Sequence, residues 1–362
     1  MATIPNGDAN TLRVGPHSEY SCGMRTILIS LNDDPQYGPY VLCGWHLKSA
    51  IPLPELTLWS GVRKSRPEET VRIELQSLPP NECELPYFIN GEDGVSLHVK
   101  GVGGFRVNRR ADRVTVLPED GVDPLLLRIH LFGSVLAILC YRRGLFPLHG
   151  SCVLLDGEAV VFSGASGTGK STLATALARR GHPLLCDDIC AIDLSNPTRP
   201  MLRPAFSRVK LMPDAINCFQ MGEAVTYSQA ARGPKGHFGM AAIQPAGAIQ
   251  QPVPLGAIYA LSTPSGDQPS RSLLQSKNAF VFIESQAHRG WMGRNLGLCE
   301  QLFGHIATLA ATVPVYRLDR PCDLDRVDEV ARLVETAHNA VCAPTEMEFR
   351  QGTRNGREDC SQ

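Results

Sequence analysis

The stretch GASGTGKST, near the middle of the chain, restricts the possible folds more than any other feature. It has the form G-x-x-x-x-G-K-[ST], in which glycines let consecutive backbone N–H groups surround phosphate oxygens, the lysine reaches the terminal phosphates and the hydroxyl holds Mg²⁺. The run before it predicts a strand, and residues 171–180 predict a helix that ends at Gly181. The sequence therefore predicts a phosphate-binding loop formed by Gly164, Ala165, Ser166, Gly167, Thr168, Gly169, Lys170, Ser171 and Thr172.

Two consecutive carboxylates stand close to this loop in the sequence. Asp187 follows Lys170 by 17 residues, at the end of the apolar run PLLC, and Asp188 is next. Because consecutive strand residues point in different directions, one carboxylate can face the metal while the other faces the incoming nucleophile. A kinase needs both functions, one acid on Mg²⁺ and one accepting the proton of the acceptor hydroxyl. The pair predicts phosphoryl transfer, with a solvated turn as the structural alternative.

A histidine and several cations complete the candidate site. His149 stands at the entrance of a hairpin, which the pair Asp156-Gly157 between two apolar runs predicts. A histidine at that position can exchange protons with a carboxylate near neutral pH, although a purely structural role is the alternative. Four cations could neutralise charge on the migrating phosphoryl group: Lys210, which we favour first, Lys235, which we favour second, Arg208 and Arg232. The alternative is that they are ordinary surface charges.

The chain divides into regions of different pattern. A small β-rich domain is predicted from five short runs, RTILISL, TVRIELQ, VSLHVKG, GFRVN and DRVTVLP. The two prolines of SAIPLPEL predict an extended connector. Residues 123–143 begin with Asp123-Pro124 and predict a helix between two domains. We expect a flexible arm at 1–22, a β-rich N-terminal domain at 23–122, an α/β catalytic domain at 123–340 and a flexible tail at 341–362.

Three later features of the sequence predict the rest of the catalytic domain. Residues 212–252 are rich in Gly, Gln, Ala and Pro, which predicts a functional lid or a disordered segment. The runs LGAIYAL and VPVYRL predict strands. The last helix is predicted from DLDRVDEVARLVETAHNA, whose apolar side carries Leu324, Val327, Val330, Val334 and Ala337.

Composition argues against several classes of partner. The formal net charge is −1, which disfavours binding to nucleic acid or to an anionic membrane surface, although a local basic patch is compatible with it. The apolar run LFGSVLAILC is short for a membrane span and predicts a buried helix. The N-terminus lacks the apolar segment of a signal peptide, and the 12 cysteines form no C-x-x-C pair. We expect reduced thiols, no zinc and a cytoplasmic protein.

Taken together, HGS, then GASGTGKST, then LLCDDICAI resemble the C-terminal catalytic domain of bacterial HPr kinase/phosphorylase, over about residues 145–215. The fold of that family resembles phosphoenolpyruvate carboxykinase rather than the common P-loop NTPases. The resemblance implies that Lys170 contacts the transferred phosphate and that Ser171 binds Mg²⁺. It implies that Asp187 is the base on an acceptor serine, with Asp188 near the metal and His149 adjusting the protonation of Asp187.

The resemblance has a limit. Where that family carries an E-x-R-G-L-G segment, this chain reads FSRVKLMPDAIN, so HPr as the substrate, the reverse reaction and a hexamer are not implied. The whole chain is more similar to divergent HPr-kinase-like proteins, some of which phosphorylate a serine at the C-terminus of a lasso-peptide precursor. We expect a kinase that uses ATP and Mg²⁺ and acts on a serine hydroxyl of a peptide or protein. The alternatives are a small-molecule kinase and a regulatory nucleotide-binding module without transfer.

Overall fold

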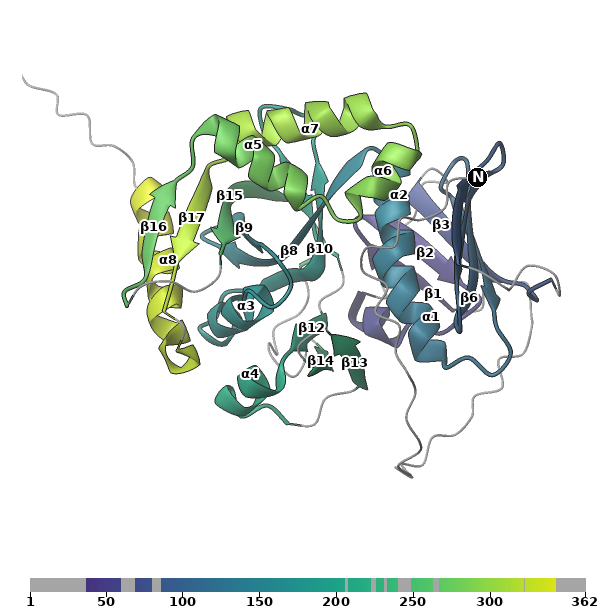
Figure 1. The fold of residues 1–362 in the computed structure, drawn as a ribbon, viewed down its shortest axis with the longest axis horizontal. Coiled ribbons are helices and arrows are strands. Elements are labelled where there is room, and N and C mark those ends of the chain that lie inside the picture. The colour runs from purple at the N-terminus through teal and green to yellow at the C-terminus, as the bar shows by residue number, and fades with distance from the viewer. Residues whose placement is uncertain are drawn as a thin grey trace, which may run out of the picture.

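The computed structural model describes residues 37–59, 69–79, 86–205, 208–222, 226–230, 233–239, 249–262, 267–321 and 323–342. Two seven-stranded sheets, a smaller three-stranded sheet and the helices around them make up these residues, so the chain has a mixed α/β fold (Figure 1).

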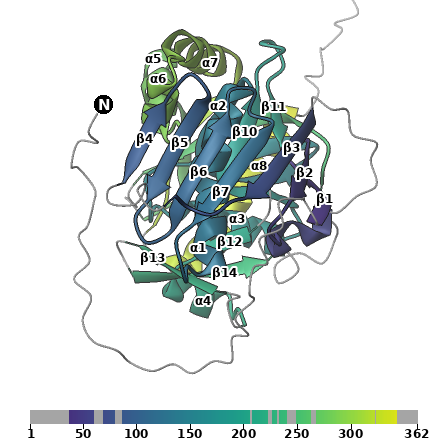
Figure 2. The ribbon, with the colours of Figure 1, turned by 90° about the vertical axis from the view of Figure 1, so that its right-hand side faces the viewer.

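The first sheet is formed by the N-terminal part of the described chain (Figure 2). Its strand order is β1-β2-β3-β7-β6-β5-β4, with β2–β3 and β3–β7 parallel and the other pairs antiparallel. The predicted strands at TVRIELQ, VSLHVKG, GFRVN and DRVTVLP are confirmed, whereas RTILISL lies outside the described residues. The strands are β1 (Tyr37–Leu42), β2 (Trp45–Ser49), β3 (Thr70–Leu75), β4 (Tyr87–Asn90), β5 (Gly94–Val99), β6 (Gly103–Asn108) and β7 (Arg113–Pro118).

The proline-containing connector after β2 is extended only in part. Residues Pro54–Trp59 form a 3₁₀ helix, η1, so the prediction of an extended segment is wrong from Pro54 onward. Proline is tolerated in the first turn of a helix, and turning the chain there buries both Leu53 and Leu56 completely. The Leu56 N–H donates to the Leu53 carbonyl over 2.9 Å, which closes the turn.

A single helical run, Pro124–Arg142, lies between the two large sheets (Figure 1). It consists of α1 (Pro124–His130), a π-helical turn η3 (Leu131–Val135) and α2 (Leu136–Arg142), and the Asp123 carboxylate accepts the Leu125 N–H over 2.8 Å. By length and composition alone this run could cross a membrane. The ten-residue stretch LFGSVLAILC is only part of it, so the apolar helix is longer than the sequence analysis predicts. Because 61% of its most apolar window is buried inside the protein, it serves here as a core helix.

The second large sheet carries the phosphate-binding loop. Its order is β11-β10-β8-β9-β15-β17-β16, and β11 also pairs with β15, which closes five of the strands into a ring. The predicted hairpin is confirmed, with Asp156 and Gly157 at φ 46° and 85° in its turn. The strands are β8 (Leu145–Leu155), β9 (Glu158–Ser163), β10 (Leu184–Asp193), β11 (Met201–Arg203), β15 (Val253–Leu261), β16 (Ser270–Leu273) and β17 (Val315–Asp319).

Helices cover both sides of this sheet. α3 (Lys170–Arg179) and α8 (Val327–Cys342) share one apolar cluster, in which Leu173, Val330 and Val334 are almost completely buried. The prediction of an amphipathic last helix is thus confirmed, with η5 (Leu324–Arg326) as its first turn. The other cluster joins the first sheet, α1–α2 and the second sheet to helices that were not predicted, namely α5 (Ser276–Ser285), α6 (Gly290–Asn295) and α7 (Cys299–Thr312).

Residues 212–252, predicted to be a lid or a disordered segment, form regular secondary structure in part. α4 (Pro213–Cys218), β13 (Thr226–Ala230) and β14 (Gly233–Gly239) lie within it, and β12 (Arg208–Leu211) joins the two strands in a sheet of order β12-β14-β13. Backbone hydrogen bonds hold this sheet together, and its strands have no alternating apolar pattern. A prediction from the composition of residues 212–252 therefore did not find these strands. Residues 223–225, 231–232 and 240–248 of the predicted lid lie outside the described residues.

Candidate functional site

The phosphate-binding loop joins β9 to α3, the context that its sequence predicts. Gly164, Gly167 and Gly169 have φ values of 154°, 83° and 84°, which favour glycine and let the chain turn sharply. The first turn of α3 leaves backbone N–H groups without helical acceptors, and the N-terminus of a helix attracts anions. The loop therefore offers the backbone donors that a phosphate group needs.

The lysine of the loop is held against the loop itself. Its ammonium group donates to the carbonyl oxygens of Gly164 over 2.8 Å and Ala165 over 3.0 Å, and the side chain is only 7% exposed. Burial lowers the pKa of Lys170 to about 8, and the nearby Asp187 carboxylate opposes that shift. Because this pKa is still above neutral, Lys170 carries its positive charge where a phosphate would bind.

Asp187 lies between β8, α3 and β12. Its Oδ1 accepts hydrogen bonds from the hydroxyls of Ser151 over 2.5 Å and Ser171 over 2.8 Å, and its Oδ2 accepts the Lys210 N–H over 3.0 Å. The residue is 4% exposed. Three donors around a buried carboxylate fix its direction, since hydrogen bonds to a carboxylate are among the strong ones.

Asp188 points to a different set of partners. Its backbone has φ 81°, a conformation that non-glycine residues adopt only under local constraint. Its carboxylate receives the Lys210 ammonium over 2.7 Å and lies 3.4 Å from Nδ1 of His149. Burial raises the pKa of the Asp188 carboxyl, but the positive charge of Lys210 beside it outweighs that effect and holds the pKa well below its usual range.

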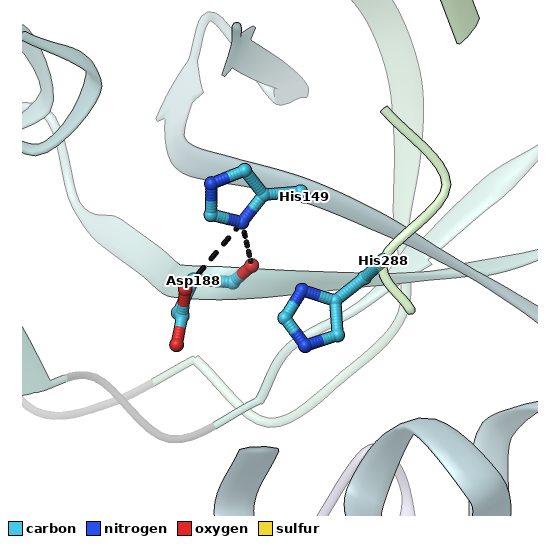
Figure 3. A group of neighbouring side chains, drawn as sticks. All are labelled: His149, Asp188 and His288. Carbon is cyan, nitrogen blue, oxygen red and sulfur yellow. Dashed lines mark hydrogen bonds and ion pairs between the residues drawn. The ribbon is translucent and has the colours of Figure 1, made fainter. Parts of the chain in front are cut away.

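A second histidine, His288, completes this side of the site (Figure 3). The segment that carries it lies along β8: the His288 N–H donates to the Pro147 carbonyl over 2.8 Å, and the His149 N–H donates to the Gln286 carbonyl over 2.8 Å. The two imidazole rings are 5.6 Å apart between centroids. Burial lowers the pKa of both imidazoles, that of His288 to about 4, so both rings are neutral at pH 7.

Close packing explains the glycine in HGS. A side chain at Gly150, which lies between His149 and Ser151, would put its Cβ 2.8 Å from the Phe162 carbonyl oxygen and 2.9 Å from Cγ1 of Val161. Glycine therefore lets β8 approach β9 closely. As a result the histidine and the serine on either side of it are brought to the level of the loop that follows β9.

Two sets of side chains could hold a metal ion. Ser171 and Asp187 offer two oxygen atoms beside the loop, the ligand type that Mg²⁺ prefers, with the phosphates supplying the rest. Within the described ranges, one group of three ligand side chains also lies close enough, His149, Asp188 and His288, whose ligand atoms are all within 4.8 Å of one another. Neutral imidazoles beside an ionised carboxylate suit a transition metal or zinc better than Mg²⁺.

The four candidate cations lie in different surroundings. Lys210 bonds to both acids through its N–H and its ammonium group, as described above, and Lys235 on β14 is close enough to Lys170 to lower its pKa. Arg208 is 6% exposed and its guanidinium lies 3.5 Å from Oε1 of Glu55 in η1. Arg232 lies outside the described residues.

The side-chain contacts at the site join different residues from those that the resemblance groups together. The resemblance pairs Ser171 with Asp188 at the metal and His149 with Asp187 at the acceptor hydroxyl. In the structure the hydroxyl of Ser171 bonds to Asp187, and His149 lies against Asp188. The physical reason is the left-handed backbone at Asp188, which directs its carboxylate away from the serine pair.

Sequence reasoning missed two functional candidates. His288 follows α5 in a region with no predicted element, and no local signal in the sequence connects it with His149. Arg320, whose guanidinium donates to the Thr168 carbonyl, follows β17 directly. β17 and β9 both run parallel to β15, and ligands bind beyond the carboxyl ends of parallel strands, so a basic residue at that position was a usable signal.

Comparison with known proteins gives one local match in sequence and a weak one in structure. A 56-residue stretch is 46% identical to the phosphoenolpyruvate carboxykinase (ATP) of Thermus thermophilus. The match covers 15% of this chain and 10% of that protein, so the chain spans a small part of its curated relative. No family model matches the chain.

Among solved structures, the HPr(Ser) kinase/phosphatase from Coxiella burnetii is 15% identical, with a TM-score of 0.29. The alignment covers 54% of this chain and 97% of that one. A TM-score this low does not establish a shared fold.

Proposed function

We propose that this protein is a kinase that uses ATP and Mg²⁺ to phosphorylate a serine hydroxyl of a peptide or protein. The observation that carries the proposal is that one site combines the phosphate-binding loop with two differently bonded acids. Asp187 shares a hydrogen bond with the loop serine, Ser171, while Asp188 faces away from it toward histidines and Lys210. Phosphoryl transfer needs both a metal-side and an acceptor-side group.

The donor side of the proposed reaction belongs to the loop. Backbone N–H groups of the loop and of the first turn of α3 would bind the β- and γ-phosphates of ATP, with Lys170 exchanging its carbonyl partners for phosphate oxygens. Arg320, which bonds to the loop at Thr168, adds a second positive charge at the same place. The local sequence match to an ATP-dependent carboxykinase supports ATP as the donor.

The Mg²⁺ site that we propose is formed by Ser171 and Asp187, which exchanges the roles that the resemblance gives to the two acids. A bound Mg²⁺ would neutralise charge on the transferred phosphoryl group. Asp187 suits this role because three donors hold it in one orientation beside the loop. Ser151 in particular donates to Oδ1, the same carboxylate oxygen that accepts the hydroxyl of the loop serine.

The acceptor side is assigned to Asp188. Its side chain is 27% exposed, against 4% for the residue Asp187 as a whole, so a substrate hydroxyl can approach it more easily. Asp188 would orient that hydroxyl and accept its proton, and the neutral His149 ring beside it could pass the proton on. Lys210, bonded to Asp188 over 2.7 Å, would move toward the developing phosphate charge.

For the acceptor itself, the support is the resemblance of HGS, the loop and LLCDDICAI to HPr-kinase-like proteins. Within that class we propose the C-terminal serine of a lasso-peptide precursor as the specific acceptor. The experiment is intact-mass spectrometry of a precursor peptide, encoded next to this protein, after incubation with the protein, ATP and Mg²⁺. We expect a gain of phosphate that fragmentation localises to the C-terminal serine.

Two controls make that experiment decisive. A precursor with the serine replaced by alanine should gain nothing, and the Asp188→Asn variant should bind ATP but transfer at a strongly reduced rate. Phosphate gain by another serine would keep the kinase and remove the proposed acceptor. ATP hydrolysis at the same rate with and without peptide, and no phosphate on the peptide, would overturn the proposal.

A further inference from the structure

A second polar cavity lies away from the phosphate-binding loop, where the first sheet meets the end of α2 and the second sheet. Its volume is about 780 Å³, and Trp45 of β2 and Leu145 of β8 contribute to its wall. Pockets for small molecules usually measure about 300–1,000 Å³. The cavity therefore has the size of a small-molecule site and is built from segments far apart in the sequence.

Positive charge dominates this cavity. Two carboxylates, Glu69 and Asp112, also line it, and Asp112 accepts a hydrogen bond from Nδ2 of Asn108 over 2.6 Å. The whole chain has a formal net charge of −1, so an excess of guanidinium groups here is a local feature. The four arginines in the lining are Arg110, Arg142, Arg143 and Arg203.

Two of the arginines are fixed in place by the fold. Arg143 donates from Nε to the Ala111 carbonyl over 2.8 Å, and its guanidinium lies 5.1 Å from the centre of the Trp45 ring. Arg203 forms an ion pair of 2.6 Å with Asp193. Both groups are held by partners from other strands or loops, so the wall that they form is rigid before any ligand arrives.

Arg142 is bonded less completely. One of its terminal nitrogens donates to Oδ1 of Asn90 over 2.6 Å, which is a neutral acceptor. Its Nε is buried, and no hydrogen-bond partner for it is found among the described residues. Among the described residues no acid pairs with the Arg142 guanidinium, so an anionic group in the cavity would bind its terminal nitrogens strongly. Arg110, on the exposed turn between β6 and β7, also lines the cavity.

The cavity is separated from the phosphate-binding loop along β8. Leu145 lines the cavity and pairs with Asp193, whereas Gly150 pairs with Ser163, the last residue before the loop. Five residues of strand span roughly 16 Å. An anion in the cavity therefore occupies a position distinct from that of a phosphate in the loop.

We propose that this cavity is a second anion site, which binds a small molecule with at least two anionic groups. Arginine recognises phosphate and carboxylate through paired hydrogen bonds, so a diphosphate, a phosphate ester or a polycarboxylate shares the chemistry required. The site is independent of the proposed kinase activity, because none of its lining residues belongs to the phosphate-binding loop or to the two acids.

The test uses the full chain with the loop blocked by a saturating nonhydrolysable ATP analogue and Mg²⁺. Isothermal titration calorimetry then measures binding of inorganic pyrophosphate and, separately, of citrate. We expect about one equivalent of at least one probe to bind, and Arg142→Gln to weaken that binding about tenfold or more, as expected for loss of a hydrogen bond to a charged partner. The matched control is Arg113→Gln, which removes the same charge from an exposed position on β7 outside the cavity and should bind normally.

Each outcome decides the question. Binding of pyrophosphate alone assigns the site to phosphate compounds, and binding of citrate alone assigns it to carboxylates. Should Arg142→Gln not fold, as judged by its melting curve, Arg110→Gln on the exposed turn takes its place with the same expectation. Absence of binding once the loop is blocked, or an equal loss in Arg113→Gln, overturns the proposal. Neither result affects the proposed kinase, whose test does not involve this cavity.

Discussion

The two sides of strand β10 differ in how the fold assembles them. The loop side, formed by Lys170, Ser171 and Asp187, comes from a strand, a loop and a helix that follow one another along the chain. The histidine side, formed by His149, Asp188 and His288, needs a segment about a hundred residues farther on to lie against β8. Local sequence therefore specifies the loop side, whereas tertiary packing completes the histidine side.

The electrostatic surroundings differ as well. Asp187 accepts hydrogen bonds from two hydroxyls and a backbone N–H, so no positive charge bonds to it directly. Asp188 has an ammonium group and two imidazoles around it. The first arrangement surrounds its acid with neutral donors, which suits the Mg²⁺ site that we propose, and the second makes the acid dependent on groups that can move or titrate.

The largest effect is expected from the loop side. Replacing Lys170 by alanine removes the ammonium group that bonds to the Gly164 and Ala165 carbonyls of the loop, so transfer should fall about a thousandfold or more. ATP affinity should fall with it. Single-turnover rates and calorimetry with the ATP analogue measure the two effects. A variant that kept a tenth of the wild-type rate would mean that the loop does not carry the reacting phosphate.

Replacing each of the two acids by asparagine should impair a different property of the enzyme. Asp188→Asn should lower the transfer rate about a hundredfold while leaving Mg²⁺ and ATP binding unchanged, because general-base catalysis contributes that much. Asp187→Asn should instead raise the Mg²⁺ concentration needed for half-maximal rate. Titration of both variants with Mg²⁺ makes the comparison. If the Mg²⁺ dependence shifted in Asp188→Asn alone, the roles implied by the resemblance would be restored.

A smaller effect is expected from the pH dependence of stability. His288 has a pKa of about 4 in the folded protein, below the ordinary 6.5 of the unfolded chain. The unfolded chain therefore binds the extra proton first as the pH falls from 6.5 to 4, so the fold is destabilised by an amount on the order of 3 kcal/mol. His288→Gln should flatten the curve of unfolding free energy against pH in this window.

Urea unfolding at pH 7 and at pH 4.5 provides the measurement for that prediction. The low pKa values of His149 and His237 act in the same direction, so a residual slope should remain in the variant. An unchanged slope would show that His288 is not the buried neutral group described above.

The smallest effect is expected from Ser151→Ala. The substitution removes one of the three donors to Asp187, which should reduce the free energy of unfolding by about 2 kcal/mol. The histidine side should not respond, so the His288-dependent part of the pH curve should stay as in the wild type. A joint change in both properties would mean that the two sides are coupled through β8.

The sequence predicted those parts of the fold that depend on neighbouring residues. The loop, the Asp156-Gly157 hairpin, the helix capped by Asp123 and the apolar side of α8 each follow from local rules. It did not predict α5, α6 and α7, or the sheet of β12, β13 and β14, because no strong local signal was recognised there. The same dependence on neighbouring residues explains which site residues the sequence predicted. Asp187 and Lys170 lie close together in the sequence and were predicted, whereas His288 reaches the site only through contacts between distant segments.

The ring of five strands has a consequence for how this chain can vary in length. Leu202 pairs with Val253, so the chain leaves the ring after Arg203, at the end of β11, and returns to it beside β11 at the start of β15. We call residues 204–252 the cassette; its two ends are joined by the backbone pairing of β11 with β15. Because closing a longer or shorter loop between fixed ends changes the free energy only slowly with length, the cassette can be exchanged or resized while the ring stays intact. Since the cassette carries Lys210, which bonds to both acids, and Lys235, which lowers the pKa of Lys170, exchanging it would change the charges around the site while the ring of strands stays the same.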